Sequence, residues 1–208
     1  MHTPDGIVPG SLVLVRHGET EWSRSGQHTG VTDLPLLPDG ERAATRLAAA
    51  LAEYSFVRVL VSPLQRARRT AQLAGLSDVE IDPRLVEWDY GAYEGLTTPE
   101  IRERLGHAWE VFNDPIEPGE TPGESLSEVA QRAQSVLDDV VPELARGDVA
   151  VFGHGHALRI LAAVYLGVDP AFGAQLVLDA GSISALTHHR ATRCIGAWNL
   201  TPGNALPA

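Results

Sequence analysis

Residues 149–166, VAVFGHGHALRILAAVYL, contain a predicted change from strand to helix, and this change decides the fold class. Four consecutive apolar residues, Val149–Phe152, predict a strand that is buried on both faces. Gly153 and Gly155 then form a turn, and the apolar stretch that continues to Leu166 has the length of a helix. A buried strand that leads through a short turn into a helix is the repeating unit of α/β proteins.

The same unit recurs toward both ends of the sequence. Leu12–Val15 and Val57–Val61 are further apolar strands, and Ser62-Pro63 pairs an N-cap residue with a proline at the first helical position. Further helices are predicted at Asp39–Tyr54, from Ser62 to about Ala74, from Thr98-Pro99 onward and at Ser125–Val140. Ser125 and Glu128 form a capping-box signature at the start of the last of these. Later strands are predicted at Gln175–Leu178, Ile183–His188 and Ala191–Trp198. This alternation predicts an α/β domain whose mostly parallel sheet is covered on both faces, with ligands bound at the carboxyl ends of the strands.

Length and composition narrow the class of protein. The 208 residues suit one domain, residues 1–208, with a core at about 11–198 and flexible ends at 1–9 and 201–208. Sixteen Lys and Arg against 27 Asp and Glu give a net charge of −11, which disfavours nucleic acid or an anionic membrane as a partner. The single Cys194, expected as a small apolar side chain in a strand, fits a reducing compartment. With no stretch long enough to span a bilayer, we expect a soluble cytoplasmic protein.

Two strand ends carry residues suited to holding an anion. Arg16-His17-Gly18 follows the first strand, where a rigid element would fix the imidazole and the arginine offers a planar set of donors for phosphate or carboxylate. Arg66 lies in the first turn of the helix after the second strand, and a helix N-terminus attracts anions through its free amides. Because the rest of the chain is acidic, these arginines indicate a local anion-binding cluster. The alternative is that the arginines of this helix form a solvated basic face.

The turn at Gly153-His154-Gly155-His156 admits two other interpretations. It nearly matches the dinucleotide-binding fingerprint, but Leu158 stands where that fingerprint has glycine or alanine. The His-x-His spacing could also belong to a metal site, yet Asp33, His188 and His189 show no spacing that would complete the ligand set. We therefore expect neither a nicotinamide cofactor nor a metal.

Residues 87–95, EWDYGAYEG, combine acidic side chains with aromatic rings and glycines. A partly desolvated carboxylic acid can donate a proton near neutral pH. On composition alone, three residues would serve equally: Glu87, Asp89 and Glu94. The aromatic residues could form an apolar wall for a leaving group or could belong to the core: Trp88, Tyr90 and Tyr93.

Taken in order, these motifs resemble the histidine phosphatase superfamily, which includes the phosphoglycerate mutases and many small acid phosphatases. The likeness runs from Leu12 to about Leu186 and is carried by RHGETEW at 16–22, Thr29-Gly30 with DLPL at 33–36, SPLQRARRTA at 62–71, EWDYGAYEG at 87–95 and GHGHALR at 153–159. The resemblance implies a three-layer α/β/α sandwich. GQHTG at 26–30 and LDAG at 178–181 look like the branch that holds sedoheptulose bisphosphatase and broad-specificity acid phosphatases.

The resemblance also implies a role for each motif in a two-step reaction that needs no cofactor and no metal. His17 would be the nucleophile and carry a transient phosphohistidine, and Glu87 would be the proton donor. Three residues would line the phosphate pocket: Arg16, Arg66 and His154. Five more would bind the substrate: Ser23, Thr29, Gly30, Gly155 and His156. Ser23 and His156 depart from the mutases, which have asparagine at both positions.

The segment after the glutamate loop favours hydrolysis over transfer. Mutases use a longer basic segment there, whereas this chain offers Arg102 and Arg104 and then the acidic stretch 113–124. A site left open to water hydrolyses its phosphoenzyme before a second substrate can accept the phosphoryl group. The sequence thus predicts a phosphatase that hydrolyses small phosphate monoesters, such as sugar phosphates, and that could form a homodimer. The alternatives are a cofactor-dependent phosphoglycerate mutase and a non-catalytic phosphate-binding regulatory protein.

Overall fold

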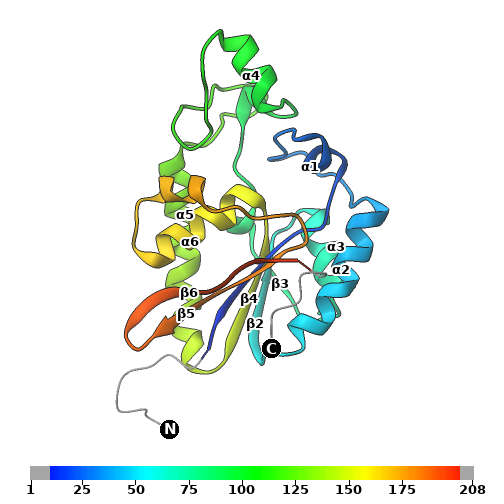
Figure 1. Cartoon of the computed structure of the whole chain (residues 1–208), viewed down its shortest axis with the longest axis vertical. Helices are drawn as coiled ribbons and strands as arrows, with labels where there is room; N and C mark the ends of the chain where they lie inside the picture. Colours follow the sequence, from blue (N-terminus) through cyan, green and yellow to red (C-terminus); the bar gives the residue numbers. More distant parts are fainter. Residues whose placement is uncertain (1–9, 202–208) are drawn as a thin grey trace.

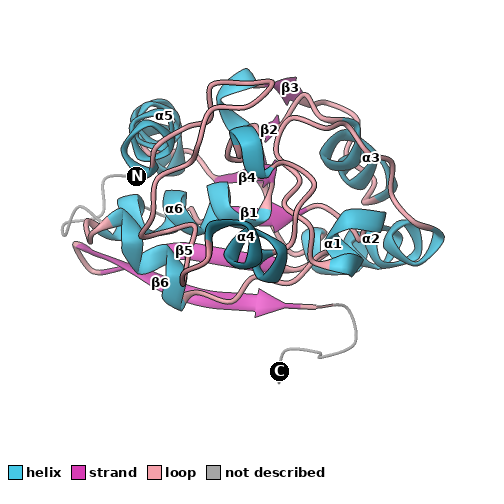
Figure 2. Cartoon of the chain, turned by 90° about the horizontal axis from the view of Figure 1, so that it is seen from above, coloured by secondary structure: helices cyan, strands magenta, loops and turns pink. Residues whose placement is uncertain are grey.

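All strands of the computed structural model, which describes residues 10–201, belong to one sheet. They are Leu12–Arg16 (β1), Phe56–Val61 (β2), Glu80–Ile81 (β3), Asp148–Gly153 (β4), Ile183–His189 (β5) and Thr192–Leu200 (β6). The order across the sheet is β3-β2-β4-β1-β5-β6; the first four are parallel, whereas β5 is antiparallel to both β1 and β6 (Figure 2). The mostly parallel sheet predicted from the sequence is confirmed. Of the termini expected to be flexible, 1–9 and 201–208, all residues except Thr201 lie outside the described part of the chain.

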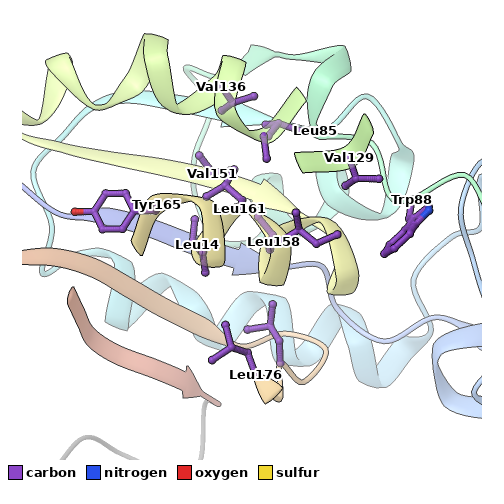
Figure 3. Packing of buried hydrophobic residues seen from close by; sticks show 14 of the residues in the cluster. Leu14, Leu85, Trp88, Val129, Val136, Val151, Leu158, Leu161, Tyr165 and Leu176 are labelled. Carbon is purple, nitrogen blue, oxygen red and sulfur yellow. The ribbon is translucent and has the colours of Figure 1, made fainter. Parts of the chain in front are cut away.

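The two faces of this sheet are covered by different pairs of helices, which gives the three layers (Figure 1). Side chains alternate between the faces of a strand, so neighbouring residues of β1 enter different cores. Leu12 and Leu14 pack with α5 (Leu126–Val140) and α6 (Gly155–Leu166), in the cluster shown in Figure 3. Val13 and Val15 pack in a second cluster with α2 (Pro38–Leu51) and α3 (Gln65–Leu73).

The helix starts follow the expected caps in part. Ser125 caps α5 in a capping box with Glu128, as predicted. The helix α4 (Thr98–Leu105) is capped by Thr97, one residue earlier than expected. The prediction that Ser62 caps α3 is wrong, because the helix begins at Gln65; the Ser62 hydroxyl accepts from His154 Nε2 at 2.7 Å and from Leu64 N at 3.4 Å. A short helix, α1 (Glu21–Ser25), was not predicted; Thr20 and Ser23 form its capping box.

The predicted strand at Gln175–Leu178 is also wrong. A 3₁₀ turn at Pro170–Gln175 ends there, and the following residues form no ladder. Leu176 and Leu178 are nevertheless buried while Val177 is exposed, which explains the alternating, strand-like pattern. Side chains of β6 hold this segment in place of a strand, since Trp198 Nε1 donates to Val177 O at 2.5 Å. Cys194, the free cysteine, lies half-buried in β6 as expected of a residue in a strand.

The segment from Glu87 to Ser125, which carries α4, extends beyond the carboxyl ends of the parallel strands and stands at the top of Figure 1. Trp88, Tyr90 and Tyr93 are each 1% exposed and belong to the core, and Trp88 lies at the edge of the cluster in Figure 3. Tyr90 in addition lines the cavity described below. The segment is therefore packed firmly over the ends of the strands. Among residues 10–201, no helix combines the length and apolar character needed to cross a bilayer.

Candidate active site

Three adjacent parallel strands end at the same level and present the predicted motifs side by side. β4 lies between β1 and β2, with Arg16 paired to Gly153 and Val61 paired to Phe152. Beyond the ladder, His17 N donates to Gly153 O at 3.0 Å and Ser62 N donates to Phe152 O at 3.0 Å. The register thus brings His17, Ser62 and the residue after Gly153, His154, to one edge of the sheet.

The hydrogen bonds of His17 determine which ring nitrogen is available. Its Nδ1 lies 2.7 Å from Gly18 O, and a carbonyl can only accept, so Nδ1 carries the proton. Nε2 is left with a lone pair and has no protein partner within residues 10–201. Burial lowers the pKa of His17 well below its ordinary value, and Arg66 and Arg16 lower it further. The imidazole is therefore neutral at neutral pH, with a free Nε2.

His154 and Arg66 hold one another in place behind this ring. Arg66 Nε donates to His154 Nδ1 at 3.1 Å, so His154 carries its proton on Nε2 and donates to Ser62 Oγ at 2.7 Å. Arg66 also donates to the carbonyls of Thr29, Gly30 and Thr32 at 2.8–3.0 Å. Both side chains are fully buried, and the ring of His154 lies 5.1 Å from that of His17 between centroids.

The N-terminus of α3 differs from the anion-binding site that the sequence predicts there. The amide of Gln65, at the start of this helix, donates to Asp33 Oδ1 at 2.8 Å. A carboxylate of the protein itself thus occupies the helix N-terminus that was expected to attract an external anion. Arg69 pairs with Glu41 at the surface, so it is a structural residue of the helix.

Arg16 has far fewer partners than Arg66. Its Nη1 donates to Leu178 O at 2.5 Å, and its buried Nε has no hydrogen-bond partner in the described part of the chain. Burial lowers the pKa of Arg16, and the charge of Glu87 is the largest influence that raises it again. An arginine stays protonated under all ordinary conditions, so this guanidinium brings a positive charge with unused donors. Gly155 lies against it: a Cβ on that residue would approach Arg16 Cζ to 3.3 Å.

Glu87 is held at the N-terminus of α6 by backbone amides. Its Oε1 accepts from Trp88 N at 2.9 Å and Ala157 N at 2.8 Å, and its Oε2 accepts from His156 N at 3.0 Å. The side chain is almost fully buried. Oε2, which has a single amide donor, keeps the more open lone pairs.

These side chains surround a cavity of about 320 Å³ at the carboxyl ends of the strands. We call the part of the cavity that is lined by His17, Arg16, Glu87 and Gly155 its inner end. Arg66 and His154 lie behind the inner wall and do not line the cavity themselves. The inner end therefore joins a free imidazole nitrogen, a guanidinium with unused donors and a carboxyl group, on a protein whose net charge is −11.

Comparison with known proteins identifies the family. The sequence profile of the histidine phosphatase superfamily (branch 1) matches residues 12–201. The chain belongs to the histidine phosphatase superfamily. It is similar to an acid phosphatase of Mycobacterium tuberculosis, at 35% identity over 94% of this chain and 95% of that protein. It is also similar to sedoheptulose 1,7-bisphosphatase of Saccharomyces cerevisiae, at 40% identity over 75% of this chain and 67% of that protein.

Solved structures agree with this assignment. The product of the Mycobacterium tuberculosis open reading frame Rv3214 superposes with a TM-score of 0.87 at 35% identity, covering 93% of this chain and 98% of that one. The alpha-ribazole phosphatase of Shigella flexneri superposes with a TM-score of 0.76 at 26% identity, covering 95% and 100%. This histidine phosphatase is thus an α/β enzyme with a central six-stranded sheet.

Among the three acidic residues of the 87–95 loop, the structure of this histidine phosphatase separates one from the others. Glu87 lines the cavity. Asp89 instead accepts from Gly91 N, Thr121 Oγ1 and Gly123 N, which stabilises a turn. Glu94 accepts from the amides of Gly30 and Thr32 at 3.0 Å. Composition alone left these three equivalent, whereas the fold places only Glu87 of them against the cavity.

The remaining expected substrate-binding residues are placed less uniformly. Ser23 and Thr29 line the cavity, but Ser23 Oγ donates to Thr20 O at 3.1 Å and Thr29 Oγ1 donates to Gln27 O at 3.2 Å. Gly30 lies outside the lining, with its amide bonded to Glu94 and its carbonyl to Arg66. Gly155 and His156 line the cavity.

A second part of the cavity, which we call its outer end, is lined by His28, Tyr90, Phe112, His156 and Arg159. The sequence pointed to His156 as a substrate-binding residue and to Tyr90 as part of a wall for the leaving group, and it missed the other three. The Arg159 guanidinium lies 4.7 Å from the Phe112 ring centroid and donates to Gly173 O at 2.8 Å. A signal existed for Arg159, because it stands four residues after Gly155 and hence on the same face of α6. Within the described residues, no cluster of three or more His, Cys, Asp and Glu side chains could hold a metal ion.

Proposed function

We propose that this enzyme hydrolyses small phosphate monoesters by a two-step reaction in which His17 carries the phosphoryl group and Glu87 transfers the proton. The observation that carries the proposal is the state of His17: Nδ1–H bonded to Gly18 O, and a free Nε2 at the inner end of a cavity that Arg16 and Glu87 also line. A neutral imidazole with a fixed tautomer is a competent nucleophile.

In the first step, the Nε2 lone pair forms a bond to phosphorus as the bond from phosphorus to the ester oxygen breaks. Charge spreads over the three remaining oxygens, and Arg16, whose Nε has no protein partner within residues 10–201, is positioned to donate to them. Glu87 supplies its proton to the departing alkoxide, and three backbone amides hold the carboxyl group for this transfer.

In the second step, Glu87 is a carboxylate and accepts a proton from a water molecule as that water attacks phosphorus. The bond from phosphorus to Nε2 breaks, inorganic phosphate leaves, and both side chains return to their starting states. Arg66 and His154 act through their neighbours in this scheme. Their mutual hydrogen bond and the bond to Ser62 fix the surface against which the His17 ring packs.

The surroundings of the cavity favour hydrolysis over a mutase reaction. Arg102 pairs with Glu110 and Arg104 donates to Ala92 O, both at the surface of the 87–125 segment. Neither arginine lines the cavity, so residues 87–125 place no basic side chain there that could bind a second anionic group. Water can therefore enter and take the phosphoryl group. A small phosphorylated metabolite as substrate, a cytoplasmic location and a homodimer remain predictions; light scattering during gel filtration tests the last.

The decisive experiment traps the phosphoenzyme. Rapid mixing with p-nitrophenyl phosphate is expected to give a burst of p-nitrophenol, and alkaline quenching followed by peptide mass spectrometry is expected to find the phosphoryl group on His17. His17→Ala is expected to fold and to show neither. His189→Ala, which changes an exposed histidine at the far end of β5, is the matched control and should behave as wild type.

Retained turnover in His17→Ala, or activity that a chelator abolishes in the wild type, would falsify this mechanism. Phosphate binding without turnover in the wild type would instead indicate the non-catalytic alternative. Conversion of 3-phosphoglycerate to 2-phosphoglycerate, dependent on a bisphosphate primer and faster than hydrolysis, would indicate the mutase.

A further inference from the structure

Two histidines outside the reacting group share the outer end of the cavity. The rings of His28 and His156 lie 6.1 Å apart between centroids, with an interplanar angle of 17°. They come from distant parts of the chain, His28 from the loop after α1 and His156 from the first turn of α6. Both line the cavity that contains His17, and neither takes part in the mechanism above.

The tautomer of His28 is fixed by the backbone. Its Nδ1 lies 2.7 Å from Leu96 O, so Nδ1 must be the donor and Nε2 carries a lone pair. Nε2 has no protein partner within residues 10–201 and is not among the fully buried polar atoms, which leaves it facing the cavity. Edge-on contacts with Tyr90 and Trp109 hold the ring, with centroids 4.8 Å and 5.5 Å away. His28 thus offers a fixed hydrogen-bond acceptor.

The tautomer of His156 is the opposite one. Its Nδ1 lies 2.5 Å from the hydroxyl of Tyr90, a phenol that is 1% exposed. This hydroxyl has no other acceptor in the described part of the chain, so it donates to Nδ1, and burial with Glu87 and Glu94 nearby raises the pKa of Tyr90 and keeps the phenol protonated. Burial also lowers the pKa of His156 well below its ordinary value, and Arg159 adds to this effect. The neutral ring therefore carries its own proton on Nε2 and offers a donor.

We propose that His28 and His156 form a subsite that recognises a free hydroxyl group on the alcohol part of the substrate. This inference rests on the proposed function and narrows its substrate class to phosphate esters of polyhydroxylated alcohols, such as sugars. A hydroxyl can donate to His28 Nε2 and accept from His156 Nε2–H at once, which satisfies both rings.

Other groups fit this pair less well. A fully ionised phosphate only accepts, so it could bond to His156 Nε2–H and to Arg159 at the same end of the cavity, but it would leave His28 Nε2 without a donor. An alkyl or aryl group would leave both nitrogens without partners, which costs more than the loss of the hydrogen bond itself. A site built to bond to a hydroxyl therefore discriminates against the analogue that lacks it.

The first test compares glycerol 3-phosphate with propyl phosphate, which has the same carbon chain without the hydroxyls. We expect the wild type to prefer glycerol 3-phosphate in kcat/KM by about tenfold or more. His28→Phe keeps a ring against Tyr90 and Trp109 but removes the acceptor, and it should reduce this preference at least about threefold. Because the same two substrates are compared in both enzymes, their intrinsic difference in reactivity cancels.

A second His28 variant tests whether the effect of His28→Phe comes from misfolding. His28→Asn can keep the donor to Leu96 O while lacking the cavity acceptor, so it should lose the same preference as His28→Phe. His189→Phe, a ring placed at the far end of β5, should leave the preference unchanged. An equal preference in wild type and in both His28 variants would overturn the proposal while leaving phosphatase activity intact; failure to hydrolyse either ester would instead count against the proposed function.

The second test does not depend on activity. Nitrogen-15 NMR of the imidazoles distinguishes the two neutral tautomers, and near pH 7 we expect His28 as Nδ1–H and His156 as Nε2–H. Tyr90→Phe removes the donor to His156 Nδ1 and should shift His156 toward a mixture of tautomers while His28 is unchanged. The same tautomer in both rings, or a cationic ring at this pH, would contradict the subsite.

Discussion

The two ends of the cavity differ in what supports their free polar atoms. Behind the inner end, His154, Arg66 and Ser62 are bonded to one another and to the backbone, and the free atoms of that end are His17 Nε2 and donors of Arg16. At the outer end, His28 and His156 each have one nitrogen bonded and the other turned to the cavity.

This difference separates chemistry from recognition. A rigid, fully bonded network at the strand ends fixes the nucleophile, since the surroundings of His17 cannot rearrange without breaking buried hydrogen bonds. The free ring nitrogens of His28 and His156 at the outer end instead form their second hydrogen bond only when a ligand binds. Changes at the inner end should therefore affect every substrate, whereas changes at the outer end should depend on the leaving group.

The largest effect that would sharpen this contrast is expected from Glu87→Gln. Removing the transferable proton should lower kcat/KM for an alkyl phosphate by about 10²–10⁴-fold, the usual contribution of general acid catalysis. The loss should be much smaller for p-nitrophenyl phosphate, whose phenolate leaves without protonation. Steady-state kinetics with the two esters checks this, and Asp89→Asn in the same loop, outside the cavity, should show no such dependence on the leaving group. Equal losses with both esters would mean that Glu87 does not protonate the leaving group.

The next largest effects should distinguish the two buried arginines. Arg66→Met leaves the carbonyls of Thr29, Gly30 and Thr32 without their donor, so we expect a loss of about 3 kcal/mol or more in the free energy of unfolding. Arg16→Met breaks one hydrogen bond to the protein, so its cost in stability should be about 1 kcal/mol while kcat/KM falls about 10²–10³-fold. Urea unfolding and kinetics on both variants check this; a larger stability loss for Arg16→Met would reverse the assignment of roles.

Much of the inner end could be predicted from the sequence, because it follows from strands and register. The runs Leu12–Val15 and Val149–Phe152 identify parallel strands, and parallel strands bring their carboxyl ends together. His17 and His154 each stand two residues after the end of such a run, so their proximity follows from the pairing of the strands. The start of α3 was misjudged because a hydroxyl that could cap a helix found a stronger partner in a buried histidine, a contact between residues 92 positions apart.

The outer end was much less predictable, because side chains from loops and 3₁₀ turns build it. His28 and Phe112 have no periodic pattern around them, and their positions depend on how the 87–125 segment packs. Likewise, nothing in the composition of the EWDYGAYEG loop distinguishes Glu87 from Glu94. Their roles diverge because α6 presents free amides to Glu87, while the loop amides of Gly30 and Thr32 meet Glu94.

The buried histidines of both ends should make stability depend on pH in the same direction. Burial lowers the pKa values of His17, His28, His154 and His156 below 6.5 in the folded protein. The unfolded chain therefore binds more protons at mildly acidic pH, and the folded state loses stability as the pH falls below about 6.5 until the folded pKa values are reached. Each such histidine contributes up to about 1.4 kcal/mol per pH unit.

Urea unfolding at about pH 7 and about pH 5.5 measures this slope. His17→Ala should reduce it more than His28→Phe, because the pKa of His17 lies well below its ordinary value in the folded protein, whereas burial lowers the pKa of His28 less. His189→Ala, exposed at the end of β5, is the control and should leave the slope unchanged. A stability that does not change over this range would mean that these rings accept protons in the folded state as readily as in the unfolded chain.

The smallest effect is expected from a substitution at Gly155, at the boundary between the inner and outer ends of the cavity. Its substitution by alanine places a Cβ 3.3 Å from Cζ and Nε of Arg16, a contact that requires the guanidinium to shift by a few tenths of an ångström. Alanine is a better helix former than glycine, so Gly155→Ala should not destabilise α6. We nevertheless expect kcat/KM to fall about three- to tenfold, because the substitution displaces the Arg16 guanidinium that stabilises charge on the phosphoryl group. In the Arg16→Met background the same substitution should have almost no further effect, since the group it displaces is already gone. Equal losses in both backgrounds would show instead that Gly155 matters to the substrate directly, which would extend the recognition surface down to the reacting histidine.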